Sequence, residues 1–159
     1  MNELRLRLAI RAIVLDEDER VLLVRFDFGD RVVWATPGGG IEDQETDEQT
    51  LRRELLEEAG LEEFELGPLV WTRTHEFPLA VGRWDGQIER YYVVRTSAFE
   101  PTPQLSWEEL RLEGMTAVRW WRLDELEAAE TVFAPRRLPL LVRSLVEEGL
   151  PAEPIDAGV

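Results

Sequence analysis

The sequence contains no cysteine, which excludes disulfides, zinc–thiolate sites and cysteine nucleophiles. It also contains no lysine, so all 18 basic residues are arginines. No apolar run approaches the length of a membrane span, and no basic segment followed by an apolar one opens the chain. These absences lead us to expect a cytoplasmic protein without a membrane-spanning segment.

Positive charge is scarce as well. The 33 acidic residues outnumber the basic ones, and the formal net charge is −15. Duplex nucleic acid and anionic membranes are bound through basic surfaces, so neither is an expected partner. An acidic protein can still act on a small anion if a divalent cation bridges the two, and this possibility directs the search for a site.

The length and composition indicate one globular domain. A chain of 159 residues, 44% of them hydrophobic, is long enough to bury a core. We expect this single domain to span residues 1–150, followed by a loosely held tail over 151–159. No internal repeat, linker or low-complexity tract interrupts it.

The hydrophobic pattern predicts an α/β protein, with a mixed sheet that carries helices on both faces. Strands are expected over 4–15, 20–28, 64–77, 87–98 and 118–123, and the first two should form an antiparallel hairpin. Helices are expected from Thr46 or Asp47 to Gly60, from Asp124 to Glu130 and over 135–149, with a helical turn around 107–110. Thr46 and Gln49 fit a capping box, and Gly60 is a typical helix stop.

The helix expected after Thr46 carries an unusual set of acids. Glu54, Glu57 and Glu58 stand at i, i+3 and i+4, so they project from one face, while the leucines of this helix point toward the core. Such a pattern alone is more often a solvated helix face. If the acids converge, a hard cation with oxygen ligands, Mg²⁺ or Mn²⁺, would offset their repulsion. Arg53 is placed to hold carboxylates in a fixed orientation, and Glu45 can join it from the preceding loop.

A glycine-rich loop precedes this helix. The backbone at Gly38 and Gly39 can adopt positive φ angles or approach a ligand closely. Magnesium prefers one or two carboxylates together with substrate phosphates. Loop and helix together therefore indicate phosphate chemistry.

The stretch from Gly39 to Leu61 resembles the Nudix box, G-x5-E-x7-R-E-U-x-E-E-x-G-U, in which U is aliphatic. Its defined positions are all filled, by Gly39, Glu45, Arg53, Glu54, Leu55, Glu57, Glu58, Gly60 and Leu61. The flanking elements are similar to the Nudix-type α/β/α sandwich with a mixed sheet. The resemblance implies Mg²⁺-dependent hydrolysis of a pyrophosphate bond in a nucleoside diphosphate linked to another moiety.

The resemblance also implies roles for individual residues. Glu54, Glu57, Glu58 and the carbonyl of Gly38 would bind the metal. Glu54 would also orient or deprotonate water, and Arg53 with Glu45 would brace the set. The general base stays open, because the family often has a glutamate where this chain reads Thr116-Ala117-Val118. Glu54 and three later glutamates are the candidates for it: Glu108, Glu109 and Glu113.

Substrate contacts are less constrained by the sequence. Gly38 and Gly39 are expected to approach the substrate through their backbone, and Arg73 and Arg136 to bind its phosphates or ribose. Ordinary charge pairing would explain these arginines, and also Arg25 and Arg95, equally well. The only histidine, His75, fits either a phosphate contact or a structural role. Three tryptophans in apolar-rich strands, Trp71, Trp120 and Trp121, suit the core. Four other aromatic residues could stack on a base: Phe77, Trp84, Tyr91 and Phe133.

Two other functions compete with hydrolysis. A Nudix-fold domain could bind or sense a nucleotide without hydrolysing it, although such a domain would not need every carboxylate of the box. An isomerase of allylic diphosphates would resemble a site with a catalytic cysteine, which this chain lacks. The expected partner is thus a small nucleotide or nucleotide sugar, and a homodimer is possible through an edge strand or the C-terminal helix.

Overall fold

The computed structural model describes residues 3–81 and 83–159. Its helices are α1 (Asp47–Ala59), α2 (Trp107–Leu112), α3 (Leu123–Ala128) and α4 (Leu138–Glu148). Its strands are β1 (Leu6–Leu15), β2 (Val21–Asp27), β3 (Val32–Ala35), β4 (Gly38–Gly40), β5 (Glu65–Val81), β6 (Trp84–Arg95), β7 (Met115–Trp121), β8 (Val132–Ala134) and β9 (Ile155–Asp156). The α/β class and the mixed sheet predicted from the sequence are confirmed.

The strands form one curled sheet in the order β8-β3-β2-β1-β6-β5-β9, with β4 also paired to β1 and β7 to β2. β1 and β6 run parallel along the whole of β1, and β5 and β6 form a long antiparallel pair. β1 and β2 pair only where Leu15 meets Val21, so the predicted hairpin is confirmed at its turn and then opens. Beyond that turn β2 pairs with β3 and β7.

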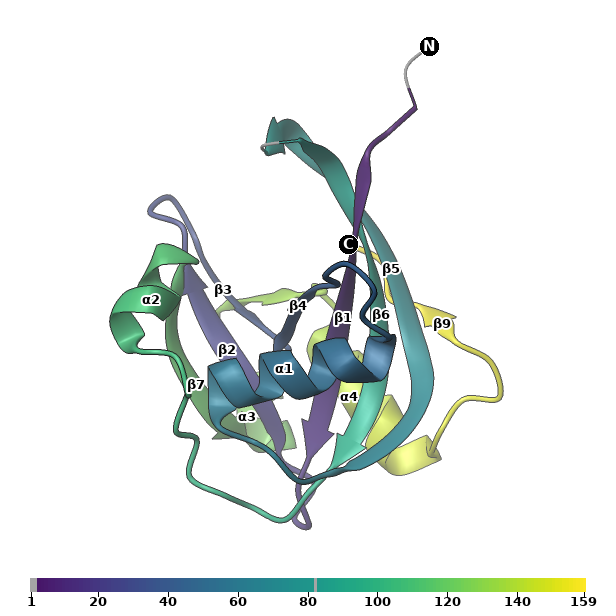
Figure 1. The fold of residues 1–159 in the computed structure, drawn as a ribbon. Coiled ribbons are helices and arrows are strands. Elements are labelled where there is room, and N and C mark those ends of the chain that lie inside the picture. The colour runs from purple at the N-terminus through teal and green to yellow at the C-terminus, as the bar shows by residue number, and fades with distance from the viewer. Residues whose placement is uncertain (1–2, 82) are drawn as a thin grey trace.

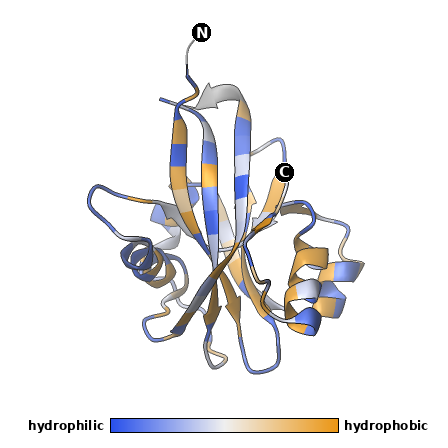
Figure 2. Ribbon diagram, turned by 90° about the vertical axis from the view of Figure 1, so that its right-hand side faces the viewer, coloured by the Kyte–Doolittle hydropathy of each residue, from blue (hydrophilic) through white to orange (hydrophobic). Residues whose placement is uncertain are grey.

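Helices cover both faces of the sheet, as predicted (Figure 1). On one face, α1 packs Leu51, Leu55 and Ala59 against the side chains of β1 at Ile10, Ala12 and Val14. On the other face, α3 and α4 pack against Ile13 and Leu15, because successive residues of a strand point to opposite sides. Figure 2 shows polar and apolar residues alternating along the upper strands, away from these packed layers.

The boundaries of α1 confirm the predicted start and stop. The Thr46 hydroxyl accepts from the Gln49 backbone N–H at 3.2 Å, and the Gln49 side chain accepts from the Thr46 N–H at 2.8 Å. Gly60 ends the helix with a left-handed φ of 72°. Of the three tryptophans assigned to the core, Trp71 and Trp121 are buried, whereas Trp120 is only partly buried and packs against the core on the side of α1.

Several other elements differ from the prediction. The glycines 38–40 form the short strand β4 on β1, and neither β3 nor β8 was predicted. α3 begins at Leu123 because Arg122 occupies the cap position, where its N–H donates to Glu125, so Asp124 does not cap the helix.

The C-terminal segment is the clearest difference from expectation. Residues 155–159 are not a loosely held tail, because β9 runs parallel to β5 and the Ala157 N–H donates to the Thr72 carbonyl at 2.8 Å. The Ala157 side chain is fully buried, and the Arg136 N–H donates to the Val159 carbonyl at 2.9 Å. A short apolar residue between polar neighbours is too weak a pattern to predict this docking. No helix in the described ranges combines the length and the apolar character that a membrane crossing needs.

Candidate active site

α1 presents its acidic face to the glycine strand β4. Glu58 is only 4% exposed, and one of its oxygens accepts from the Gly38 N–H at 2.9 Å. Burial raises the pKa of Glu58 well above its ordinary value, and the nearby charge of Glu54 raises it further, against the opposing effects of Gly38 and Arg11. A buried acid beside a second acid is an arrangement that a bound cation would relieve.

The glycines are required by this close packing. Gly38 has a φ of 143°, and a Cβ there would clash with the backbone of β1. A Cβ on Gly39 would clash with the carboxylate of Glu54. The two glycines therefore bring the strand into contact with the carboxylates, a role that the sequence pattern did not specify.

Arg53 and Glu45 form the predicted brace. The Arg53 guanidinium donates to both oxygens of Glu45, at 2.8 and 2.9 Å, and to Glu54 at 2.8 Å. It also donates to the Gly40 carbonyl at 3.1 Å. The hydrogen bonds from Arg53 lower the pKa of Glu45 to about 2. Such bidentate contacts fix the orientation of the carboxylates and also compensate their charge.

Glu57 lies at the edge of this network, 3.7 Å from the Arg53 guanidinium. Burial, followed by the charge of Glu54, raises its pKa. Within residues 3–81 and 83–159, no three His, Cys, Asp or Glu side chains are close enough together to hold an ion. The Gly38 carbonyl, the fourth predicted ligand, accepts from Arg11 at 3.1 Å. The donors are nonetheless all oxygens, and the buried Glu58 beside Glu54 matches the chemistry of Mg²⁺ or Mn²⁺.

Among the three later glutamates, only Glu113 is coupled to this centre. It follows α2, and burial together with the charge of Glu54 raises its pKa, while Arg7 and Arg53 oppose that shift. Glu109 instead accepts hydrogen bonds from Ser106 in a capping box, and Glu108 is exposed. Glu113 is thus the later glutamate that interacts with the acids of α1, whereas the sequence could not rank the three candidates for the general base.

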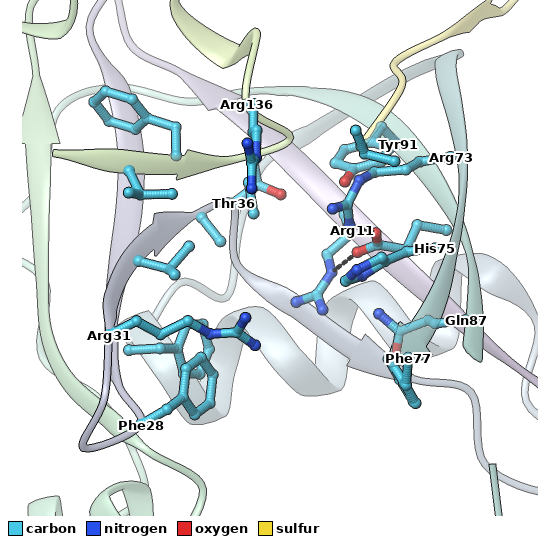
Figure 3. Close-up of a pocket in the computed structure, with 18 residues that line it drawn as sticks. Arg11, Phe28, Arg31, Thr36, Arg73, His75, Phe77, Gln87, Tyr91 and Arg136 are labelled. Atoms are coloured by element: carbon cyan, nitrogen blue, oxygen red, sulfur yellow. Dashed lines mark hydrogen bonds and ion pairs between the residues drawn. The ribbon is translucent and has the colours of Figure 1, made fainter. Parts of the chain in front are cut away.

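A cavity of about 440 Å³ opens between the β3–β8 edge and the β5–β6 pair (Figure 3). The predicted contacts Arg73 and Arg136 both line it, as does His75. Burial, and then the charge of Arg73, lower the pKa of His75. Three of the four stacking candidates, Phe77, Tyr91 and Phe133, also lie on its wall, whereas Trp84, Gly38 and Gly39 are not among the residues that line it.

A buried ionic network joins the cavity to β4. Glu89, 2% exposed, pairs with Arg11 at 2.7 Å and with Arg73, whose Nε also donates to the Gly158 carbonyl at 3.0 Å. Burial alone would raise the pKa of Glu89, but the two arginines outweigh it and lower the value. Arg11 contacts both Glu89 and the Gly38 carbonyl, so it links the cavity to the carboxylate helix.

Sequence reasoning missed three charged residues that line the cavity, Arg11, Arg31 and Glu89. It also missed Arg7, which donates to the cavity residue Gln87 at 3.2 Å. Charged residues at inward-facing positions of buried strands were the available signal for Arg11 and Glu89. Two other strand arginines do not reach the cavity: Arg25 donates to Thr116 at 2.8 Å, and Arg95 pairs with Glu19 at 3.6 Å. Ordinary polar pairing accounts for both.

Comparisons with known proteins agree with this geometry. The family model described as NUDIX domain matches residues 5–141. An RNA pyrophosphohydrolase of Sulfurovum sp. (strain NBC37-1) is 32% identical over 125 residues, covering 76% of this chain and 78% of that protein. The solution structure of the E. coli ORF135 protein superposes with a TM-score of 0.62 at 26% identity, over 94% of this chain and 96% of that one. A MutT protein from Methanosarcina mazei Go1, 19% identical, shares the fold with a TM-score of 0.68 over 92% and 99% of the two chains.

Proposed function

This chain belongs to the NUDIX domain family and is a Nudix pyrophosphohydrolase, and we propose that it acts with Mg²⁺ on a nucleoside diphosphate linked to another moiety. The observation that supports this best is the buried Glu58 beside Glu54, held against β4 by the Gly38 N–H. Arg11 and Gly38 connect these acids to a cavity lined with arginines and aromatic rings, and such a lining suits a nucleotide.

Glu54, Glu57, Glu58 and the Gly38 carbonyl would hold Mg²⁺, with Mn²⁺ as a substitute. When bound, the cation would neutralise phosphate charge and lower the pKa of an attacking water. Arg53 and Glu45 keep Glu54 oriented through the contacts described above. Gly38 and Gly39 let the strand approach these carboxylates, and through them the substrate.

Glu113 is our candidate for the general base. Glu54 accepts a hydrogen bond from Arg53, which holds its carboxylate in a fixed orientation and suits it to act as a metal ligand. Glu113 has no such partner in the described part of the chain, and its raised pKa suits it to take a proton from water. The water oxygen then attacks phosphorus, and the bond to the bridging oxygen breaks.

The substrate would place its nucleoside in the cavity and its phosphates between Arg11, Arg73 and the acids of α1. Arg136 would contact the part of the substrate farther from the acids. The family acts on small nucleotide-like molecules, and the similarity to RNA pyrophosphohydrolases adds the 5′ end of RNA to the substrates worth testing. A cytoplasmic location and a homodimer stay predictions from the sequence.

A substrate panel tests this function. Purified protein is incubated with ADP-ribose, dinucleoside polyphosphates, nucleotide sugars, NADH and a 5′-triphosphorylated short RNA, with Mg²⁺ or with chelator. We expect metal-dependent turnover of at least one compound, and loss of that turnover in Glu57→Gln. Glu48→Gln is the matched control, because Glu48 lies on the same helix and forms an ion pair with Arg52 at the surface, away from the other acids.

The rival function predicts a different outcome. A nucleotide-binding or sensor domain would retain binding but hydrolyse nothing in the panel, with or without metal. Isothermal titration with a non-hydrolysable analogue separates this case from a substrate that is missing from the panel, since a true enzyme should bind the analogue more tightly when Mg²⁺ is present.

A further inference from the structure

The cavity carries more positive charge than its own acid offsets. Arg11, Arg31, Arg73 and Arg136 line it, and Glu89 is its only acidic lining residue among those described. Glu89 is already shared between Arg11 and Arg73. In the described ranges, neither Arg31 nor Arg136 forms an ion pair, although the protein as a whole is strongly acidic. Two guanidinium groups without an acidic partner among the described residues are available to bind an anion that enters the cavity.

These two arginines lie on a different wall from the pair held by Glu89. Arg31 precedes β3 and Arg136 follows β8. Because the two strands run parallel, with Ala35 opposite Ala134, the two arginines stand at opposite ends of this wall. Arg11 and Arg73 come from β1 and β5, and Arg11 is the one that contacts Gly38 beside the acids of α1. Figure 3 shows the guanidinium groups of Arg31 and Arg136 directed into the cavity.

Aromatic residues lie on both walls of the cavity. The Arg31 guanidinium lies over the Phe28 ring at 5.4 Å, and Phe77 meets His75 edge-on at 5.8 Å. All of these side chains line the cavity. A base or ribose held here would have phosphate-binding groups on two sides: the acids of α1 with their cation, and the β3–β8 wall.

We propose that the cavity selects nucleotides that carry a second phosphate group, away from the pyrophosphate, and that Arg31 and Arg136 bind this second phosphate. The inference rests on the proposed function, because it assigns the pyrophosphate to the acids of α1. Two sources share the chemistry: a small nucleotide phosphorylated on its 2′ or 3′ oxygen, and the first nucleotide of an RNA, whose 3′ oxygen carries a phosphodiester.

Binding measured without turnover tests the inference directly. Isothermal titration compares adenosine 3′,5′-bisphosphate with adenosine 5′-monophosphate at fixed Mg²⁺. Two charge-assisted contacts should make the bisphosphate bind at least about tenfold more tightly. Arg31→Gln combined with Arg136→Gln should reduce this ratio to below about threefold, since only the ligand with the second phosphate loses its partners. The ratio should also fall as salt is raised, because these side chains are near solvent.

Matched variants make the result specific. Arg52→Gln with Arg143→Gln removes two arginines outside the cavity, on α1 and α4, that pair with Glu48 and Glu127, and should leave the ratio unchanged. Arg31→Lys with Arg136→Lys keeps the charge and should keep most of the preference. A wild-type ratio near one, or a ratio that survives the double glutamine variant, would overturn the inference.

Kinetics distinguish the small nucleotide from the RNA end. They also distinguish a failure of this inference from a failure of the proposed function. A 3′-phosphorylated nucleoside 5′-polyphosphate and a 5′-triphosphorylated dinucleotide are compared for KM. A lower KM for the 3′-phosphorylated nucleotide than for the dinucleotide indicates that the small nucleotide is the source. Equal KM values indicate that RNA ends also fit. If hydrolysis occurs but the extra phosphate changes neither KM nor affinity, only this inference fails. If no substrate is hydrolysed, the proposed function fails instead.

Discussion

Arg53 is the residue on which the geometry of the carboxylates depends. It reaches Glu45, Glu54 and the Gly40 carbonyl at once, and it lies near Glu57. Glu54 in turn sits against Gly39, where no side chain would fit. Because each of these groups constrains another, small changes at single residues should alter catalysis or pH dependence before they alter the fold.

Glu113→Gln tests the assignment of the general base. The amide keeps the size of the side chain but cannot take a proton, so kcat should fall by about 100-fold or more while KM stays within a few-fold. Steady-state kinetics with the best substrate of the panel measures both constants. Glu108→Gln, an exposed position on α2, the short helix that precedes Glu113, should behave like the wild type. Unchanged kcat in Glu113→Gln would return the role to Glu54.

Thr36 combines burial with an unused hydroxyl. It lines the cavity, is 1% exposed, and its oxygen has no hydrogen-bond partner within the described residues. Thr36→Val should therefore stabilise the free protein by about 1 kcal/mol, since a buried unpaired polar group is costly. It should also weaken nucleotide binding several-fold if the ligand supplies that partner. Thermal unfolding and titration measure the two effects, with the exposed Thr74→Val as control; a loss of stability would show that the hydroxyl is already satisfied.

The pairing of Glu45 with Arg53 predicts that the free energy of unfolding depends on pH. The pKa of Glu45 is lowered from 4.5 to about 2 by the Arg53 hydrogen bonds. A depressed carboxyl pKa stabilises the fold above pH 4.5, and this contribution disappears as the pH falls from 4.5 toward 2. Glu45→Gln should thus lower the free energy of unfolding by about 1 kcal/mol at neutral pH, the range of solvent-screened pairs. Denaturant unfolding should show this difference shrinking near pH 3, whereas a constant difference would contradict the assignment.

At the level of helices and strands, the sequence was sufficient to predict the structure wherever contacts between residues close together in the chain determine it. The start of α1 at Thr46 and its end at Gly60 depend on contacts within a few residues, and both were predicted. The spacing of Glu54, Glu57 and Glu58 likewise placed them on one face. β8 and β9 depend on pairing with distant strands, and their two or three residues carry no periodicity of their own. For the same reason, the network around Glu89 could not be predicted, because its partners are 16 and 78 residues away in sequence.

The docked segment 155–159 should act on substrate binding rather than on the chemical step. It is bound to Arg73 through the Gly158 carbonyl and to Arg136 through the Val159 carbonyl, and neither contact involves α1. Ala157→Glu places a charge at a fully buried site, so it should detach β9 and cost about 1–3 kcal/mol. KM should rise several-fold with kcat retained. The exposed Ala152→Glu is the control, and a lower kcat at unchanged KM would contradict the expectation.

The charge of the whole molecule acts over a longer range than the cavity. A net charge of −15 repels polyanions, whereas the arginines of the cavity attract only what enters it. A mononucleotide is held mostly within about 8 Å of those arginines, the screening distance at physiological salt. A long RNA has to extend over the acidic exterior. The molecule therefore combines local attraction with global repulsion, and the balance depends on substrate length.

Substrate length and salt reveal this balance. We expect kcat/KM for a 5′-triphosphorylated RNA of about 20 nucleotides to be roughly tenfold lower than for a dinucleotide at low ionic strength, where screening is weak. Raising the salt at constant Mg²⁺ should narrow the gap, because the repulsion is screened. Basic nucleic-acid-binding proteins show the opposite salt slope, since they gain affinity by releasing counterions. An RNA of equal length with uncharged methylphosphonate linkages beyond the second nucleotide should carry no penalty. A higher kcat/KM for the long RNA that falls as salt is raised would contradict this expectation. It would require a basic track on the surface, which the arginines of this cavity do not provide.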